Sequence, residues 1–384
     1  MFALATTTVA VCDWRTLKDN LIANRRVLLA GLIGLLNLLG LLYSSNIPKG
    51  FALVERSAIT VALPVMIVMV GPSKEEVDRV VYFFTITCLV ACSYCLVFSL
   101  WRVYQEGGLV NQEKMSDRTY YYFINNELTE SALKISPIYL GLYVNLCIGY
   151  LLIRVFIRKD RSKSSIALLL LLHFFQALIF AVSAILGLLA MWSLIVIWLA
   201  LHLSVKKRIA LLGVFAGLFI ALTFSIYNIK PLHDRIFVSL EYDLTRVHVS
   251  NWTGITIRLA VWQCAVEAAR DKPVFGYGTG DAEEALSKTF KSRGFALAEM
   301  LTMNAHNQYL HSYIMHGILG ITVILLVLIF PFYSSVVEKN YLLTIFITLF
   351  ALGFLTEVIL VVQKGLVFFS IFYPLLYFPG VQRK

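Results

Sequence analysis

The chain has 384 residues, of which 59% are hydrophobic and 15% are charged. A soluble globular domain is closer to half apolar, so this composition indicates a helix bundle in lipid rather than two or three soluble domains. The formal net charge of +10 does not indicate nucleic-acid binding, because the basic residues lie mostly in short clusters between apolar stretches.

The apolar stretches predict an all-α, polytopic membrane protein with about ten spans. A β-barrel is disfavoured because these stretches are continuously apolar and do not alternate. The segment Met1–Cys12 is apolar but too short to span, and we interpret it as the end of a helix that begins before this chain. We expect spans at Val27–Ser44, Ala58–Gly71, Val80–Trp101, Pro137–Ile157, Ile209–Tyr227, Gln308–Tyr333, Tyr341–Val361 and Leu366–Gly380, with two more inside Ile166–Leu203.

The positions of the basic clusters predict which polar segments share a side of the membrane. Arg158–Ser165, with the sequence RKDRSKSS, is the clearest cytoplasmic marker. Counting crossings from either basic end puts Arg102–Ser136 and Lys230–Ala305 together on the extracytoplasmic side. The chain is therefore divided into an N-terminal bundle (1–229), a long extracytoplasmic loop (230–305) and C-terminal helices (306–384), with residues 102–136 as a shorter extracytoplasmic segment.

The long loop carries ordinary helix signals. Thr253 or Thr256 would cap a helix that contains Arg258 and Trp262 and ends before Lys272–Pro273, and Asp281–Glu284 resembles a capping box that opens a second helix. Arg258 would lie in the first turn, where a guanidinium and the helix N-terminus together can hold a phosphate. The alternative is a surface arginine that lies over Trp262 or pairs with lipid head groups.

A glycine-rich segment, Phe275–Asp281 (FGYGTGD), lies between these two helices. It lacks the G-x-G-x-x-G spacing of a dinucleotide site and follows no parallel-strand unit. A tight turn is the favoured interpretation, and a phosphate cradle is the alternative.

The loop re-enters the membrane at Asn304–Leu310. We expect Asn304 to cap the next helix and His306 to lie in its first turn, where the positive helix end keeps the imidazole neutral. A neutral imidazole is suited to general-base catalysis, and the alternative is a histidine of the membrane interface. Zinc is disfavoured because His306, His311 and His316 are five residues apart and share no helix face.

The cysteines indicate neither a metal site nor a disulfide within the long loop. Cys92 and Cys95 form a C-x-x-C inside an apolar stretch and are interpreted as small buried helix residues. Cys264 is the one cysteine of the long loop.

Together these segments resemble the O-antigen ligase and polymerase superfamily. The resemblance rests on Arg258-x-x-x-Trp262, Pro273–Asp281 (PVFGYGTGD), His306–Leu310 (HNQYL) and Gly317–Gly320 (GILG), in this order. Weaker matches lie upstream, at Leu42–Asn46 with Pro64 and at Pro137–Leu140. The resemblance covers most of the chain and is specific in the long loop and the helix after it.

The resemblance implies a multi-pass protein of the bacterial inner membrane, similar in mechanism to the GT-C glycosyltransferases, whose site faces the periplasm. Its partners would be a glycan on undecaprenyl diphosphate and an acceptor, either the lipid A core or the glycan itself, and no metal or other cofactor would be needed. By position, His306 would activate the acceptor hydroxyl and Arg258 would bind the diphosphate. We expect Trp262, Gly278, Asn307 and Tyr309 to contribute to substrate binding.

The chain departs from the family pattern at the turn between two middle spans. Relatives often carry an arginine after a serine there, whereas this chain reads Ser183–Gly187 (SAILG). Arg235 or Arg246 would then supply the second cation. The short amino terminus is a further departure, since relatives have about two more spans, which gives an expected total of about 10–12.

Two other classes of function stay open at this stage. A transporter or flippase of lipid-linked sugars would place charged residues along a midplane path, and the predicted spans carry few, chiefly Glu357 and Gln176. A non-catalytic membrane assembly protein would tolerate substitutions in the loop. Within the transferase interpretation, the sequence does not separate ligase from polymerase.

Overall fold

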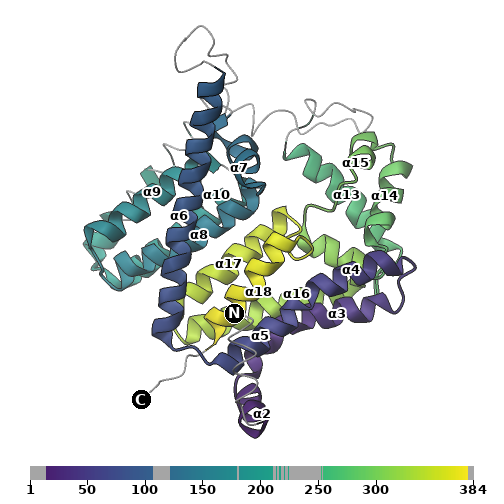
Figure 1. The fold of residues 1–384 in the computed structure, drawn as a ribbon, viewed down its shortest axis with the longest axis horizontal. Helices are drawn as coiled ribbons and strands as arrows, with labels where there is room; N and C mark the ends of the chain where they lie inside the picture. Colours follow the sequence, from purple (N-terminus) through teal and green to yellow (C-terminus); the bar gives the residue numbers. More distant parts are fainter. Residues whose placement is uncertain are drawn as a thin grey trace.

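The structure is a computed structural model, and it describes residues 14–106, 122–179, 181–210, 213, 216–217, 220, 224, 252 and 254–378. These residues form helices and no strand, which confirms the all-α prediction (Figure 1). The helices are α2 (Trp14–Ala23), η1 (Arg25–Ala30), α3 (Gly31–Leu41), α4 (Ile47–Ser57), α5 (Ile59–Val70), α6 (Lys74–Gln105), α7 (Asn125–Leu133), α8 (Pro137–Leu152), η4 (Ile153–Ile157), α9 (Lys163–Ile179), α10 (Val182–His202), α13 (Thr256–Arg270), α14 (Ala282–Ser292), α15 (Ala296–Met300), α16 (Gln308–Val337), α17 (Tyr341–Thr356) and α18 (Gln363–Tyr377).

Five stretches of the described helices are long and apolar enough to cross a membrane: Ile47–Val70, Lys74–Gln105, Pro137–Ile157, Ser183–His202 and Gln308–Val337. Two shorter apolar helices, α9 and α17, accompany them. The polytopic prediction is thus confirmed. The expected span Ile209–Tyr227 falls largely outside the described residues.

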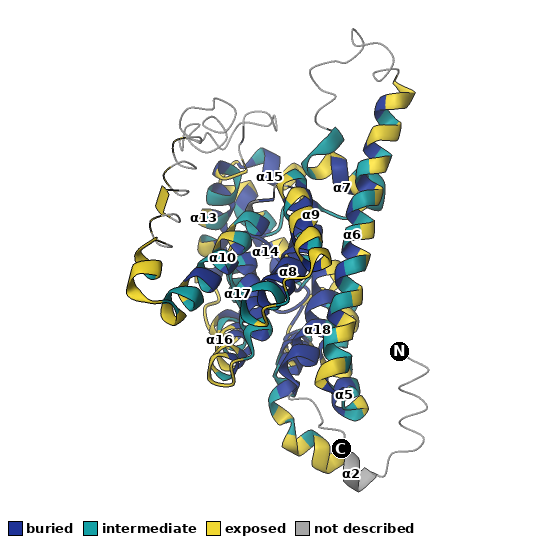
Figure 2. Cartoon of the chain, turned by 90° about the vertical axis from the view of Figure 1, so that its left-hand side faces the viewer, coloured by how far each residue is buried: buried dark blue, intermediate teal, exposed yellow. Residues whose placement is uncertain are grey.

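The centre of the bundle is α8, which buries every residue except Ile138 and Tyr143 and packs against α6, α9, α10 and α17. Figure 2 shows the buried residues concentrated on α8 and α18, whereas α6 carries an exposed stripe along its length. That stripe is apolar and recurs at helical spacing. A long exposed apolar stripe indicates contact with lipid, which offers no penalty to such side chains.

The inner face of α6 consists of small residues at three- and four-residue spacing, among them Cys88, Cys92 and Cys95. Small side chains let neighbouring helix backbones approach closely, which is how helices associate in lipid, where burial of apolar area gains little. Both cysteines of the C-x-x-C are buried free thiols. The interpretation as packing residues is confirmed.

One predicted turn is displaced. The sequence placed the break between two middle spans at Ser183–Gly187, but α10 begins at Val182 and Ser183–Gly187 is helical. The apolar run continues through these residues, and a Cβ at Gly187 would lie 2.8 Å from the Asn145 amide nitrogen. Gly187 therefore serves close helix packing, and the chain reverses earlier, around Ala181.

The helices α7 and α13, one from each of the two polar segments predicted to share a side, lie at the same end of the bundle (Figure 1). Residues 357–364, which follow α17 and include the first residues of α18, contact both segments or their ends. Glu357 lies against His306, directly after the long loop, and the Lys364 ammonium donates to the Lys134 carbonyl at the end of α7. Tyr143 also donates to the Lys364 carbonyl, at 2.9 Å. Residues 357–364 thus join the turn that carries His306 to α7 and α8.

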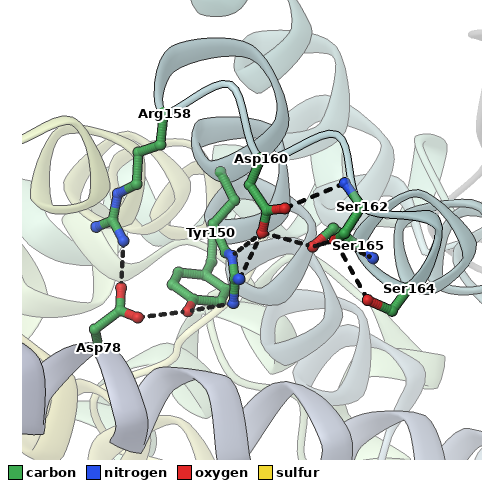
Figure 3. Close-up of polar contacts among 8 residues, drawn as sticks. Asp78, Tyr150, Arg158, Asp160, Ser162, Ser164 and Ser165 are labelled. Atoms are coloured by element: carbon green, nitrogen blue, oxygen red, sulfur yellow. Dashed lines mark hydrogen bonds and ion pairs between the residues drawn. The ribbon is translucent and has the colours of Figure 1, made fainter.

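Basic residues and their partners hold the opposite end together. Arg158 pairs with Asp78 of α6 at 2.5 Å, and the Tyr150 hydroxyl donates to the other oxygen of the same carboxylate, at 3.0 Å (Figure 3). Beside them, Asp160 accepts from Arg154 and from Ser165. This network lies in and around Arg158–Ser165, the cluster that the sequence marked as cytoplasmic.

The glycine-rich segment ties three parts of the fold together. The N–H groups of Tyr277 and Gly278 donate to Ile314 and Met315 of α16, at 2.9 and 2.8 Å. The Thr279 N–H donates to the Gly40 carbonyl at 3.3 Å, and the Gly280 N–H donates to the Ser44 hydroxyl at 3.0 Å. The turn interpretation is therefore correct, and a phosphate cradle is excluded in this arrangement because all four N–H groups bind the protein.

The packing of this segment against α16 also explains a kink in that helix. Gly317 has φ 59° and ψ −146°, a backbone conformation that side chains with a Cβ rarely adopt. The residue after it, Ile318, donates to the Pro273 carbonyl at 2.9 Å. A Cβ at Gly317 would lie 2.3 Å from the backbone of Val274, so glycine is required for both reasons.

The predicted capping box at Asp281–Glu284 is wrong. Asp281 precedes α14, but its carboxylate makes no cap and instead accepts from the N–H groups of Ser45 and Asn46, at 2.6 and 2.8 Å. Burial alone would raise the pKa of this carboxyl, and these hydrogen bonds bring the pKa below its ordinary value. The turn between α3 and α4 leaves these N–H groups open, and Asp281 is their acceptor.

We predict that Gly280→Ala destabilises the protein by about 1–3 kcal/mol, because an added Cβ would lie 2.1 Å from the Asn46 carbonyl oxygen. The measurement is thermal unfolding of the purified protein in detergent. Gly31→Ala is the matched control, since its Cβ would meet neighbours at 3.6 Å or more. An unchanged melting temperature for Gly280→Ala would show that the loop is not fixed to the α3–α4 turn.

Candidate active site

Three segments that are distant in the sequence converge at the end of the bundle for which the sequence predicts an extracytoplasmic location. They are the first turn of α13, the turn Asn304–Asn307 before α16, and the connection that follows α17. Each contributes a polar side chain, respectively Arg258, His306 and Glu357. The contacts among them define the candidate site.

His306 lies outside α16, which corrects the expectation that it occupies the first turn. Asn307 caps the helix through its side chain, and α16 starts at Gln308. His306 has φ 43°, a left-handed conformation, and its N–H donates to the Asn304 side chain at 2.9 Å. Asn304 therefore stabilises a turn and is not the predicted cap. The argument from the helix dipole no longer applies, so another group must set the state of the imidazole.

That group is Glu357. The Nδ1 atom of His306 lies 3.3 Å from the Glu357 carboxylate. Because a carboxylate only accepts hydrogen bonds, the proton of a neutral His306 belongs on Nδ1, and Nε2 is left as the basic nitrogen. The imidazole is 27% exposed and the carboxylate 7%, so the ring can reach a substrate while its partner is shielded.

Glu357 stays ionised despite its burial. It lies just beyond the last residue of α17, where its carboxylate also accepts from the Val358 N–H, at 3.1 Å. Burial alone would raise the pKa of the Glu357 carboxyl, but the hydrogen bond from His306, the Val358 N–H and the charge of Arg258 bring the pKa below its ordinary value. A charged carboxylate is what orients and stabilises a histidine that takes up a proton.

Arg258 lies in the first turn of α13, as predicted. Its Nη1 donates to the Gly254 carbonyl at 2.6 Å, and its Nε donates to the Thr356 carbonyl at 3.2 Å. The second bond fixes α13 to the end of α17, next to Glu357. Burial lowers the pKa of the guanidinium and the Glu357 charge opposes this, but an arginine stays protonated in either case. Among the described residues, Nη2 is the nitrogen left for a ligand.

The start of α13 strengthens this positive charge. The cap position, Ile255, offers no side-chain acceptor. A helix N-terminus carries a partial positive charge, which adds to that of a guanidinium in the same turn. Arg258 and the helix end together suit an anionic oxygen.

Trp262 joins α13 to the turn that carries His306. One helical turn after Arg258, its indole N–H donates to the His306 carbonyl, at 3.3 Å. This bond holds the histidine level with the second turn of α13. Trp262 thus lies beside the candidate base, as its predicted place in the site requires.

The other predicted substrate residues have structural partners. Asn307 donates to the Leu355 carbonyl at 3.1 Å besides capping α16, and the Tyr309 hydroxyl donates to the Ala351 carbonyl at 3.0 Å. Gly278 lies in the glycine-rich segment against Ser44 and Gly40, and its place in the site stays a prediction. Arg235 and Arg246 lie outside the described residues.

Sequence reasoning missed the role of Glu357. It noted this residue only as a charge near the end of a predicted span, Tyr341–Val361. The signal was present, because an acidic residue at the end of an apolar helix is costly unless it is paired. The pairing with His306 spans 51 residues, and no spacing rule connects the two positions.

The match to a known family supports the resemblance seen in the loop. The family model of the O-antigen ligase matches residues 166–325, a range that includes Arg258, Trp262 and His306. An uncharacterised protein of Haemophilus influenzae is 28% identical over 88 residues, which are 23% of this chain and 22% of that protein. The alignment therefore spans about a fifth of that relative. The match confirms the resemblance of this chain to the O-antigen ligase and polymerase superfamily, and it indicates a membrane enzyme of the glycosyl-transfer type.

Proposed function

We propose that this protein transfers a glycan from undecaprenyl diphosphate to a sugar hydroxyl at the periplasmic face of the inner membrane, as an O-antigen ligase does. The observation that carries the proposal is the pairing of His306 with a buried, ionised Glu357 within the same site as Arg258. An O-antigen polymerase of the same superfamily is the second candidate. Both reactions use the same chemistry and differ in the acceptor.

In the proposed reaction, Nε2 of His306 takes the proton of the acceptor hydroxyl while that oxygen attacks the anomeric carbon of the donor glycan. The bond between this carbon and the diphosphate oxygen breaks, and its electron pair leaves with the lipid diphosphate. Arg258 and the α13 N-terminus stabilise the charge that collects there. No metal is needed for a leaving group held in this way, in agreement with what the resemblance implies.

Glu357 acts through His306 and is therefore a positioning residue. Its carboxylate holds the ring with Nε2 unprotonated and then stabilises the imidazolium that forms. The Trp262 bond to the His306 carbonyl fixes the backbone of the same turn. The two contacts hold the base from opposite ends, through its ring and through its backbone.

We predict that His306→Ala abolishes transfer and that Glu357→Gln lowers kcat by about 10²–10³-fold, because an amide does not favour one tautomer of the ring. The measurement is product formation from purified protein, lipid-linked donor and acceptor in detergent. Glu357→Asp should recover part of the rate. Glu299→Gln, at an exposed position of α15, is the matched control.

Full activity of a folded His306→Ala variant would refute the assignment of the base. Product formation in detergent also separates a transferase from a flippase, because a transporter makes no new glycosidic bond. A protein that forms no product under any condition, but moves lipid-linked sugar across vesicles, would be a transporter.

We predict that Arg258→Ala lowers kcat/KM for the lipid-linked donor by about 10²-fold, and that Arg258→Lys lowers it by roughly tenfold because lysine keeps the charge but loses the planar fork. KM for the acceptor should change little. The rates are compared at varied donor and fixed acceptor. If both variants matched the wild type, Arg258 would have no part in donor binding.

A deletion strain distinguishes the two acceptors. For a ligase, we predict that a lipopolysaccharide gel shows a core without any polymer and that lipid-linked polymer accumulates. A core that bears one repeat unit would instead identify a polymerase. A wild-type gel pattern would exclude both.

A further inference from the structure

An open groove of about 860 Å³ runs along the outer face of α13. Its apolar wall is formed by Leu259, Trp262 and Val266, and its polar groups are Gln263, Glu267, Arg270 and Arg293. Six of these residues recur at helical spacing along α13, and Arg293 follows the end of α14. The opposite face of α13, which includes Val261, Cys264 and Ala268, is buried.

The chemistry of the groove matches that of a sugar. A pyranose ring presents an apolar face of C–H groups, which packs on an indole, and a rim of hydroxyls, which bind planar amide, carboxylate and guanidinium groups. The groove offers the indole of Trp262 with Gln263 beside it and Arg270 at its far end. Both polar residues are exposed, and the described residues supply them with no partner.

The other two polar groups of the groove, Glu267 and Arg293, are already paired with each other. Arg293 pairs with Glu267 at 2.7 Å through both Nε and Nη2, which holds the two side chains parallel at the edge of the groove. A carboxylate and a guanidinium in a fixed pair remain able to accept from and donate to hydroxyls, since each has further hydrogen-bonding positions. The groove is therefore polar along one edge and apolar along the other.

The position of the groove identifies which sugar it would hold. Along α13, Arg258 comes first, and the groove residues follow from Leu259 to Arg270. Among them is Trp262, whose indole donates to the His306 carbonyl. A helix rises 1.5 Å per residue, so the groove extends roughly 12 Å beyond Trp262 on the side away from Arg258. In a displacement at carbon, the attacking group and the leaving group lie on opposite sides of the reacting atom. The leaving diphosphate belongs at Arg258, and the attacking sugar belongs in the groove.

We propose that this groove binds the acceptor glycan, with Trp262 under one sugar ring, Gln263 on the hydroxyls of that ring and Arg270 on the hydroxyls of a further sugar along the groove. The assignment rests on the proposed function, because the direction of transfer identifies the sugar. In this assignment α13 binds the donor diphosphate near its start and the acceptor glycan further along.

The test is oligosaccharide binding to the full-length protein in detergent, measured by isothermal titration calorimetry. The probes are the core oligosaccharide released by mild acid from the lipopolysaccharide of the host, and the repeat-unit oligosaccharide of the same cells. We expect one of them to bind the wild type and the His306→Ala variant equally. The double variant Gln263→Ala, Arg270→Ala should bind it about tenfold more weakly or worse, since two hydrogen bonds are lost.

Trp262 needs a separate pair of variants, because it also bonds His306. Trp262→Phe removes the N–H and keeps a ring surface, so binding should persist while kcat falls. Trp262→Ala removes both and should lose binding as well. Lys288→Ala, on the exposed side of α14, is the matched control and should leave both quantities unchanged.

The results separate this inference from the proposed function. If the double variant binds the probe as tightly as the wild type, or transfers glycan with an unchanged KM for the acceptor, the groove is not the acceptor site although the transferase proposal stands. If neither probe binds the wild type, the groove assignment is also wrong. If the double variant loses binding but the wild type never forms product, the groove holds a glycan and the transferase proposal fails.

Discussion

The pairing of His306 with Glu357 is the contact on which the site depends. It joins the turn before α16 to the segment after α17, and Arg258 adds the start of α13 through its bond to the Thr356 carbonyl. A charge as buried as Glu357 is costly unless it is paired. The same interaction thus stabilises the junction of loop and bundle and sets the chemistry of the imidazole.

The glycine-rich segment positions the loop helices from a second direction. Its N–H groups bind α16 and the end of α3. The Asp281 carboxylate binds the N–H groups of Ser45 and Asn46 in the turn between α3 and α4. α13 is therefore held at its start by Arg258 and after its end by the glycine-rich segment, which also holds the start of α14. A base and a cation carried on separate segments keep a fixed separation only if each segment is held in this way.

Much of the bundle could be predicted from the sequence because the hydrophobic effect and the bilayer thickness act on local composition. The helical class and the polytopic organisation were correct, as was the shared end of the two polar segments. Caps were less predictable. Asp281 has the sequence of a capping residue, yet the unsatisfied N–H groups of Ser45 and Asn46 compete for its carboxylate and bind it. Asn304 and Asn307 are equally good caps by composition, and only the tertiary structure selects Asn307.

Part of the site was predictable because helical spacing can be read from the sequence. Arg258 and Trp262 are related by helical spacing, which sequence reveals, and both lie where that spacing put them. Glu357 is related to His306 only through the packing of α16 against α17. Pairings between separate elements are set by packing, and local pattern carries little information about them.

The charges of the three side chains also give the site a direction. In the proposed mechanism the imidazole is neutral before reaction, and the negative charge of Glu357 offsets part of the positive field of the nearby Arg258. When the imidazole of the proposed base takes the proton of the acceptor, Glu357 and His306 become a neutral pair. The Glu357 charge then no longer opposes the positive charge of Arg258, and this happens as negative charge builds up on the leaving diphosphate. Binding that strengthens only as the reaction proceeds is what lowers a barrier, so the carboxylate that orients the base would also make the cation selective for the transition state.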